Sequence, residues 1–126
     1  MKNYKEIITT TIKELGIPAS LTGYHYIRYA VELIIDDINL MQFVTKVLYP
    51  EIAQKFNTTV TKVERGIRNA IETGWGRANE DMIMQLFAYS VSADKGKPTN
   101  REFIVTVADY IQMMYVHPTE KGGGEE

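Results

Sequence analysis

The chain has no cysteine and only two histidines among its 126 residues. Without cysteine it cannot form a disulfide scaffold, a catalytic thiolate, a zinc finger or a thiolate-bound iron–sulfur cluster. It also lacks any apolar run near the ~18 residues of a membrane-spanning helix. The N-terminal stretch is polar and amphipathic, unlike the apolar core of a signal peptide. We therefore expect a soluble, intracellular protein with no membrane partner.

Patterns that indicate catalysis or cofactor binding are equally scarce. His25 and His117 are far apart, so the sequence contains no cluster with the spacing of metal ligands. It shows neither a legible Ser-His-Asp arrangement nor a glycine loop suited to cradle a phosphate. The sequence predicts no metal, no cofactor and no enzymatic activity.

The charge of the chain is small but unevenly distributed. The net charge is −2, which counts against nucleic-acid binding, since proteins of that class are usually basic. Between Lys46 and Arg77, however, six basic residues face three acidic ones, so this segment carries +3 and the remainder −5. A local positive stripe of this kind can attract phosphates even on an acidic protein.

Hydrophobic residues make up 44% of the chain and recur with helical spacing almost throughout. We expect one all-α domain over residues 1–118 and a flexible tail over residues 119–126, which contains three consecutive glycines. The expected helices cover about residues 4–15, 23–38, 40–48, 50–55, 60–75, 80–89 and 100–115. Their expected N-caps are Asn3, Thr22, Thr59, Asn79 and Thr99, the last with Glu102 in a capping box.

The helices at 50–55 and 60–75, joined by a tight turn, form a helix-turn-helix candidate. On a helical wheel the apolar residues of the second helix fall on one narrow stripe, with charged and polar residues opposite. The expected core stripe is Val60, Val63, Ile67, Ala70 and Ile71. The expected outer face is Thr61, Lys62, Arg65, Asn69 and Glu72, with Glu64 and Arg68 at the edge of the stripe.

This outer face carries residue types that read DNA bases. Arginine pairs with guanine, asparagine with adenine, and glutamate accepts a hydrogen bond from cytosine. Thr58 and Thr59, beside free amides at the helix start, could take a phosphate, and so could Lys97. The alternative is that these are ordinary solvated charges, with Glu64 and Arg68 forming an intrahelical pair. We expect Trp75, at the end of this helix, to pack inward.

Several runs of the chain resemble the C-terminal effector domain of the master response regulator of sporulation initiation (stage zero A) in endospore-forming bacteria. The runs are KVLYPEIAQKFNTT at 46–59, VERGIRNAIE at 63–72, GIPA at 16–19, GY at 23–24, KPTN at 97–100 and EFI at 102–104. Together they extend over about residues 4 to 112. The resemblance implies a compact six-helix domain that contains a helix-turn-helix and binds double-stranded DNA boxes similar to TGTCGAA.

The resemblance also implies roles for individual residues. It implies base contacts by Glu64, Arg65, Arg68 and Asn69, the last where the best-known relatives carry histidine. Arg65 is our candidate for guanine and Glu64 for cytosine, and the expected contacts to the DNA backbone come from Thr58, Thr59, Thr61, Lys62 and Lys97. A surface for the RNA polymerase sigma subunit would consist of Met82, Met84, Phe87 and Val91, although a stripe rich in methionine is also typical of core packing.

In that family the effector domain follows a phosphorylatable receiver domain, and nothing in this sequence resembles a receiver's acidic pocket. Both an excised domain and a natural homologue without a receiver fit the sequence, and either is expected to bind DNA constitutively. We expect a monomer in solution that pairs head to tail on tandem boxes and activates or represses transcription in the cytoplasm, associated with the nucleoid. The alternative is a helical interaction module that contacts the sigma subunit without reading DNA.

Overall fold

The computed structural model describes residues 4–88 and 96–116 of the chain. Within these residues the fold is all-α, with six α-helices and three short 3₁₀ or π segments and no strand. The helices are α1 (Lys5–Glu14), α2 (Thr22–Asp36), α3 (Tyr49–Lys55), α4 (Val60–Trp75), α5 (Glu80–Phe87) and α6 (Asn100–Ile111). The short segments are η1 (Ile38–Gln42), η2 (Val44–Leu48) and η3 (Gln112–Val116). The expectation of a six-helix, all-α domain is therefore confirmed.

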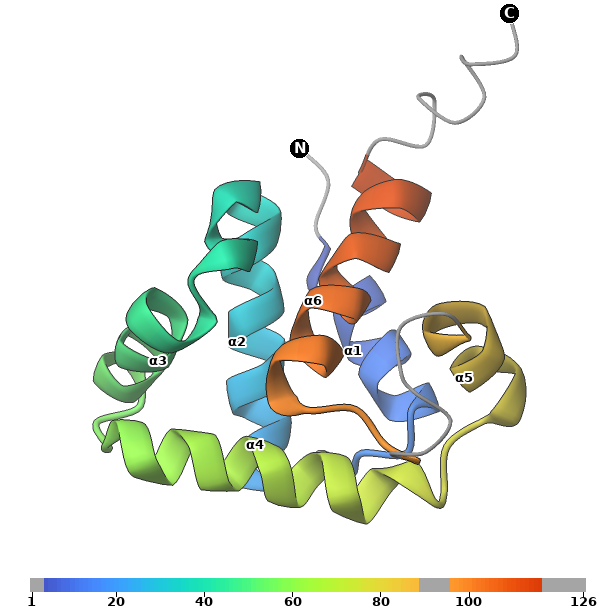
Figure 1. Ribbon diagram of the computed structural model, residues 1–126, viewed down its shortest axis with the longest axis horizontal. Helices are drawn as coiled ribbons and strands as arrows, with labels where there is room; N and C mark the ends of the chain where they lie inside the picture. The colour runs from blue at the N-terminus through green and yellow to red at the C-terminus, as the bar shows by residue number, and fades with distance from the viewer. Residues whose placement is uncertain (1–3, 89–95, 117–126) are drawn as a thin grey trace, which may run out of the picture.

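Helix α4 lies along one side of the molecule, across the lower ends of α2 and α6 (Figure 1). Helix α3 stands at the N-terminal end of α4 and α5 beyond its C-terminal end. The apolar residues that these elements bury form one continuous core. The largest fully buried side chains are Ile8, Ile12, Leu15, Ile17, Ile27, Ile34, Leu48, Ile52, Ile67, Ile71, Phe103 and Ile104. No described helix is both long enough and apolar enough to cross a bilayer.

Three of the expected N-caps are confirmed. The Thr59 hydroxyl accepts a hydrogen bond from the Lys62 amide at 3.1 Å, and Asn79 Oδ1 accepts from the amides of residues 81 and 82. Thr99 and Glu102 form the complete capping box, with bonds of 3.1 Å and 2.8 Å. Each cap satisfies backbone N–H groups that have no partner inside the helix, so the starts of α4, α5 and α6 are fixed by local contacts.

The ends of α1 and α2 differ from the expectation. Tyr4 is the residue before α1 and makes no side-chain cap, and the expected cap Asn3 lies outside the described residues. Thr22 is the first residue of α2 and does not cap it. That helix ends at Asp36 because Asp37 turns to an extended conformation, where its carboxylate accepts the Asn39 amide and caps η1 instead.

Several apolar side chains within the expected helices are exposed, and part of the expected domain is not described. Ile38 is 46% exposed in η1, and Met114 and Tyr115 are exposed in η3. Trp75 does pack inward, edge-on against the Phe87 ring, and its indole N–H donates to the Gly96 carbonyl. The expected tail at residues 119–126 lies outside the described residues.

The backbones of α2 and α4 touch at a pair of glycines, and this contact yields a prediction about stability. A Cβ added to Gly23 would lie 2.1 Å from the carbonyl oxygen of Gly66. Because this oxygen belongs to the backbone, the clash can be relieved only if one of the two helices shifts. Overpacking of this kind costs up to about 3 kcal/mol, more than the ~1 kcal/mol by which alanine favours a helix over glycine. We expect Gly23→Ala to lower the free energy of unfolding in urea by about 3 kcal/mol.

Gly76 supplies the matched control. It follows α4 with φ −74°, and nothing lies within 4 Å of the place where its Cβ would be. Gly76→Ala should therefore leave stability unchanged or raise it by about 0.4–1 kcal/mol. Equal urea midpoints for the two variants would contradict the assigned contact.

Candidate nucleic-acid interface

The turn between α3 and α4 is fixed by backbone geometry. Asn57 has φ +55°, a left-handed conformation that asparagine tolerates better than most residues. This allows the Thr58 amide to donate to the Ala53 carbonyl at 2.9 Å, which closes the end of α3. Thr59 is then extended and caps α4. The four-residue turn therefore sets the angle between the two helices of the expected helix-turn-helix.

An aromatic cluster supports this turn from the side of α2. The Phe56 ring packs edge-on against Tyr26 and Tyr29, with centroid distances of 5.2 Å and 6.0 Å. The Lys55 ammonium lies 5.4 Å from the centre of the Tyr29 ring, within reach of a cation–π contact. These contacts tie the turn to α2.

The outer face of α4 is the one that the helical wheel predicts. Thr61, Lys62, Arg65, Asn69 and Glu72 are all exposed. Neither a hydrogen bond nor an ion pair joins Arg65 to any other side chain in the described part of the chain. Its guanidinium is free to bind an external acceptor.

The first residue of α4 departs from the wheel. Val60 was expected in the core stripe, but it is 41% exposed because it precedes the turn of helix that packs on the core. Val63, Ile67, Ala70 and Ile71 are buried as expected. The exposed N-terminal end of α4 therefore includes one apolar side chain beside its polar ones.

Glu64 and Arg68 form an ion pair along the side of α4. The Arg68 Nη2 lies 3.0 Å from Glu64 Oε2, and both side chains are about half exposed. Pairs of this kind at i, i+4 contribute only about 0.3–0.5 kcal/mol to stability. The pair therefore orients the two side chains more than it stabilises the fold, and it is the intrahelical contact that the alternative interpretation anticipated.

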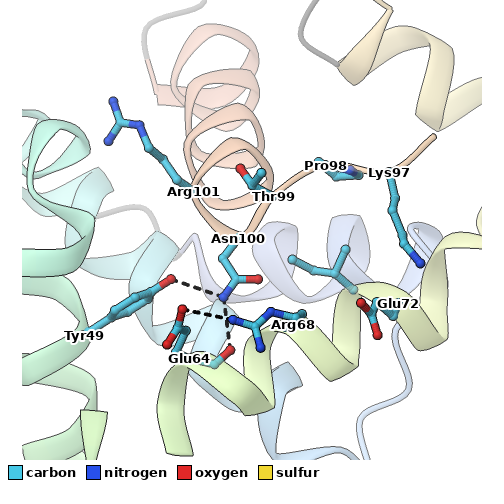
Figure 2. A pocket seen from close by; sticks show the side chains of 10 residues that line it. Tyr49, Glu64, Arg68, Glu72, Lys97, Pro98, Thr99, Asn100 and Arg101 are labelled. Carbon is cyan, nitrogen blue, oxygen red and sulfur yellow. Dashed lines mark hydrogen bonds and ion pairs between the residues drawn. The ribbon is translucent and has the colours of Figure 1, made fainter. Parts of the chain in front are cut away.

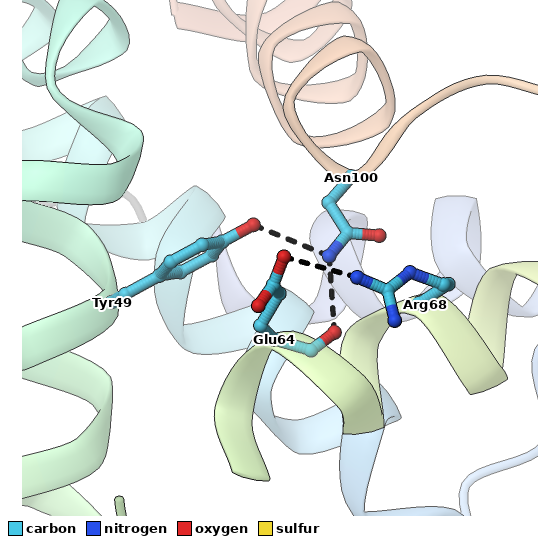
Figure 3. A network of polar contacts seen from close by, with 4 residues as sticks. All are labelled: Tyr49, Glu64, Arg68 and Asn100. Atoms are coloured by element: carbon cyan, nitrogen blue, oxygen red, sulfur yellow. Dashed lines mark hydrogen bonds and ion pairs between the residues drawn. The ribbon is translucent and has the colours of Figure 1, made fainter. Parts of the chain in front are cut away.

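Asn100, the first residue of α6, reaches across to α4 (Figure 3). Its side-chain amide donates to the Glu64 backbone carbonyl at 3.1 Å and to the Tyr49 hydroxyl at 3.2 Å. This contact joins α3, α4 and α6 at one point. Sequence reasoning missed it because the partners are 36 and 51 residues away from Asn100, and no local pattern reports such a separation.

A groove of about 540 Å³ lies between α4 and the start of α6 (Figure 2). Arg68 and Glu72 line it from α4, and Lys97 lines it from the segment before α6. Lys97, for which the sequence predicted a phosphate contact, is exposed and lies near α4. Arg101 points away from α4 and donates to the Met41 carbonyl at 3.1 Å.

The two threonines at the start of α4 differ in what they can offer a phosphate. The Thr59 hydroxyl uses a lone pair to cap the helix but keeps its hydrogen for an external acceptor. The Thr58 amide donates to the Ala53 carbonyl, so only the Thr58 side chain can bind a phosphate. The described residues provide no partner for the Val60 and Thr61 amides, so these two can face an anion.

The expected sigma-facing surface is only partly accessible. Met84 is 65% exposed, and Met82 is half-buried. Phe87, expected on this surface, is only 3% exposed because its ring packs between Trp75 and Phe103. Val91 lies outside the described residues. The interpretation of Phe87 as a contact residue is therefore wrong, and its role is in the core.

A model of the family described as "Sporulation initiation factor Spo0A C terminal" matches residues 8–111 of the chain. The match includes α3, the turn, α4 and Asn100. It therefore extends over the whole interface described above and over most of the core.

The pKa of the buried Tyr49 hydroxyl makes stability depend on pH in the alkaline range. Desolvation raises the pKa of Tyr49 above 10.0, and the Glu64 charge adds to this effect, whereas the hydrogen bond from Asn100 and the Arg68 charge oppose it. Because the folded protein holds this proton more tightly than the unfolded chain, Tyr49 contributes stability below about pH 10 that is lost as the pH rises further. We expect Tyr49→Phe to lose less stability than the parent between about pH 9 and pH 11 in urea titrations. Parallel losses in the two proteins would contradict this assignment.

Proposed function

The chain belongs to the family of the C-terminal domain of sporulation initiation factor Spo0A, and from this premise we propose that α4 reads a specific DNA sequence in the major groove. The family consists of DNA-binding effector domains that regulate transcription. We further propose which residues read bases, which sequence they read and how two copies bind together.

The single observation that carries the proposal is that Arg65, on the outer face of α4, is exposed and has no partner among the described residues. It lies in the N-terminal half of the helix, the part of a helix-turn-helix that contacts base edges in the major groove. An α-helix with its side chains is about 10–12 Å in diameter, so the major groove, about 12 Å wide, admits α4. Arg65 can then donate two hydrogen bonds to one guanine.

The neighbours of Arg65 divide between base and backbone contacts. Asn69 lies one turn further along the same face and can bind a base edge or a phosphate. Glu64 can accept from cytosine with Oε1, while Oε2 stays bound to Arg68. The backbone contacts we assign are those of Thr58, Thr59, Thr61, Lys62 and Lys97, with Thr58 contributing its side chain.

The proposed target is a box similar to TGTCGAA, with two domains bound head to tail on tandem boxes. The domain would be monomeric before it binds, and it would act in the cytoplasm as an activator or repressor. A contact with the RNA polymerase sigma subunit would use Met82 and Met84, since Phe87 is buried. Val91 stays part of this proposal.

A second function, sigma binding without DNA reading, is favoured only by the exposed Met84. The two functions differ in which substitution abolishes them. A DNA reader requires Arg65, whereas an adaptor tolerates Arg65→Ala and loses its partner when Met84 is replaced by a charged residue.

Base discrimination should depend on Arg65. Arg65→Ala should weaken binding to a TGTCGAA-like duplex by about 1–3 kcal/mol, because it removes one bidentate guanine contact, and should change binding to a scrambled duplex little. Fluorescence anisotropy with both labelled duplexes at one salt concentration measures the difference. If the variant kept the full preference for the box, the assignment of this face of α4 to the major groove would be wrong.

Binding to the phosphate backbone should depend on Lys62. Lys62→Ala should weaken binding to both duplexes equally and lower the salt slope by about one, because it removes one phosphate contact without affecting base reading. The measurement is the same anisotropy titration repeated over a series of salt concentrations. A loss confined to the box would instead assign Lys62 to a base.

A further inference from the structure

The amide of Asn100 has two hydrogens and faces two acceptors. A backbone carbonyl can only accept, so the contact of 3.1 Å with the Glu64 carbonyl fixes the NH₂ group toward α4. The second N–H then points to the Tyr49 hydroxyl at 3.2 Å. Both donors of the half-buried amide are therefore used, on two different helices (Figure 3).

The contact is placed at the residue pair that we assign to base reading. The Glu64 carbonyl has a second lone pair beside the one that faces the amide of residue 68 within the helix. Asn100 occupies this second lone pair, so it binds α4 without disturbing the intrahelical bonds. Arg65 follows directly in the chain, and the Glu64 side chain binds Arg68.

The backbone around Asn100, at the start of α6, is fixed by its own contacts. The capping box of Thr99 and Glu102 fixes the first turn of α6, and Pro98 before it is buried. Further along, Phe103 and Ile104 anchor α6 in the core with no exposed surface. Asn100 therefore holds the N-terminal half of α4 in a fixed position relative to α6 and the core.

We propose that Asn100 is a positioning residue that sets how α4 enters the major groove, and so determines base discrimination without touching DNA. This inference rests on the proposed function of α4. Base contacts carry the sequence information and need side chains aligned with the base edges, whereas phosphate contacts carry affinity without sequence information. Loss of the Asn100 contacts should therefore lower discrimination and leave the salt slope unchanged.

The test uses Asn100→Asp beside Asn100→Ala. Aspartate has nearly the same shape but lacks both amide hydrogens, and an acid in the first turn of α6 favours the helix. Its added charge weakens the binding of both duplexes alike. The ratio of box to scrambled affinity therefore reports the placement of α4 and not the added charge. We expect this ratio to fall about tenfold in both variants, the lower end of what one base contact provides.

Ile8→Val is the matched control, because Ile8 is buried in α1 and its truncation destabilises the core. It should lower the melting temperature while it keeps the affinity ratio. Hydrogen exchange without DNA gives an independent readout, and the hydrogen-bonded amides of residues 63–68 should exchange faster in Asn100→Asp than in the parent.

The outcomes separate this inference from the proposed function. If the parent prefers the box and both Asn100 variants keep its ratio, positioning by Asn100 is overturned and DNA reading by α4 stands. If Ile8→Val lowers the ratio as much as they do, the effect is general destabilisation and the inference also fails. If the parent shows no preference for the box, the proposed function fails and the inference fails with it.

Discussion

Helices α2 and α4 meet backbone to backbone at Gly23 and Gly66, and the position of every element around α4 depends on how closely they approach. A side chain on Gly23 would collide with the carbonyl of Gly66. With the two helices this close, Val63 and Ile67 are fully buried and the opposite face of α4 is left to solvent. Which face of α4 is exposed is thus set by a contact on the other side of the helix.

A second close contact fixes the direction of α4. Gly16 ends α1 with φ +86°, and a Cβ there would lie 2.2 Å from the Gly74 carbonyl oxygen. Positions 66 and 74 are about 12 Å apart along the helix. Two backbone contacts at this separation leave α4 little freedom to swing, which suits a helix that must present several side chains to a groove in one orientation.

The polar residues of α4 divide into those bound within the protein and those left free. Glu64 and Arg68 bind each other, and Asn100 binds the Glu64 backbone, whereas Arg65 has no partner among the described residues. Bound side chains lose less conformational freedom when they meet a ligand. The α4 surface therefore combines a preorganised edge with an exposed arginine, Arg65, that no described residue binds.

The sequence alone determined the features that depend on near neighbours. Thr59, Asn79 and the Thr99–Glu102 capping box lie within a few residues of the amides they bind, so their patterns predicted where α4, α5 and α6 begin. The long runs at residues 46–72 likewise indicated the family that the match over residues 8–111 shows.

The tertiary structure alone decided which apolar side chains are buried and which polar ones meet. Val60 is exposed although helical spacing placed it in the core stripe, and Phe87 is buried although the family resemblance placed it on a contact surface. Spacing reports which face of a helix a residue lies on, but not whether another helix covers that part of the face. Asn100 meets Glu64 for the same reason, because only the packing of α6 on α4 brings residues 36 positions apart into contact.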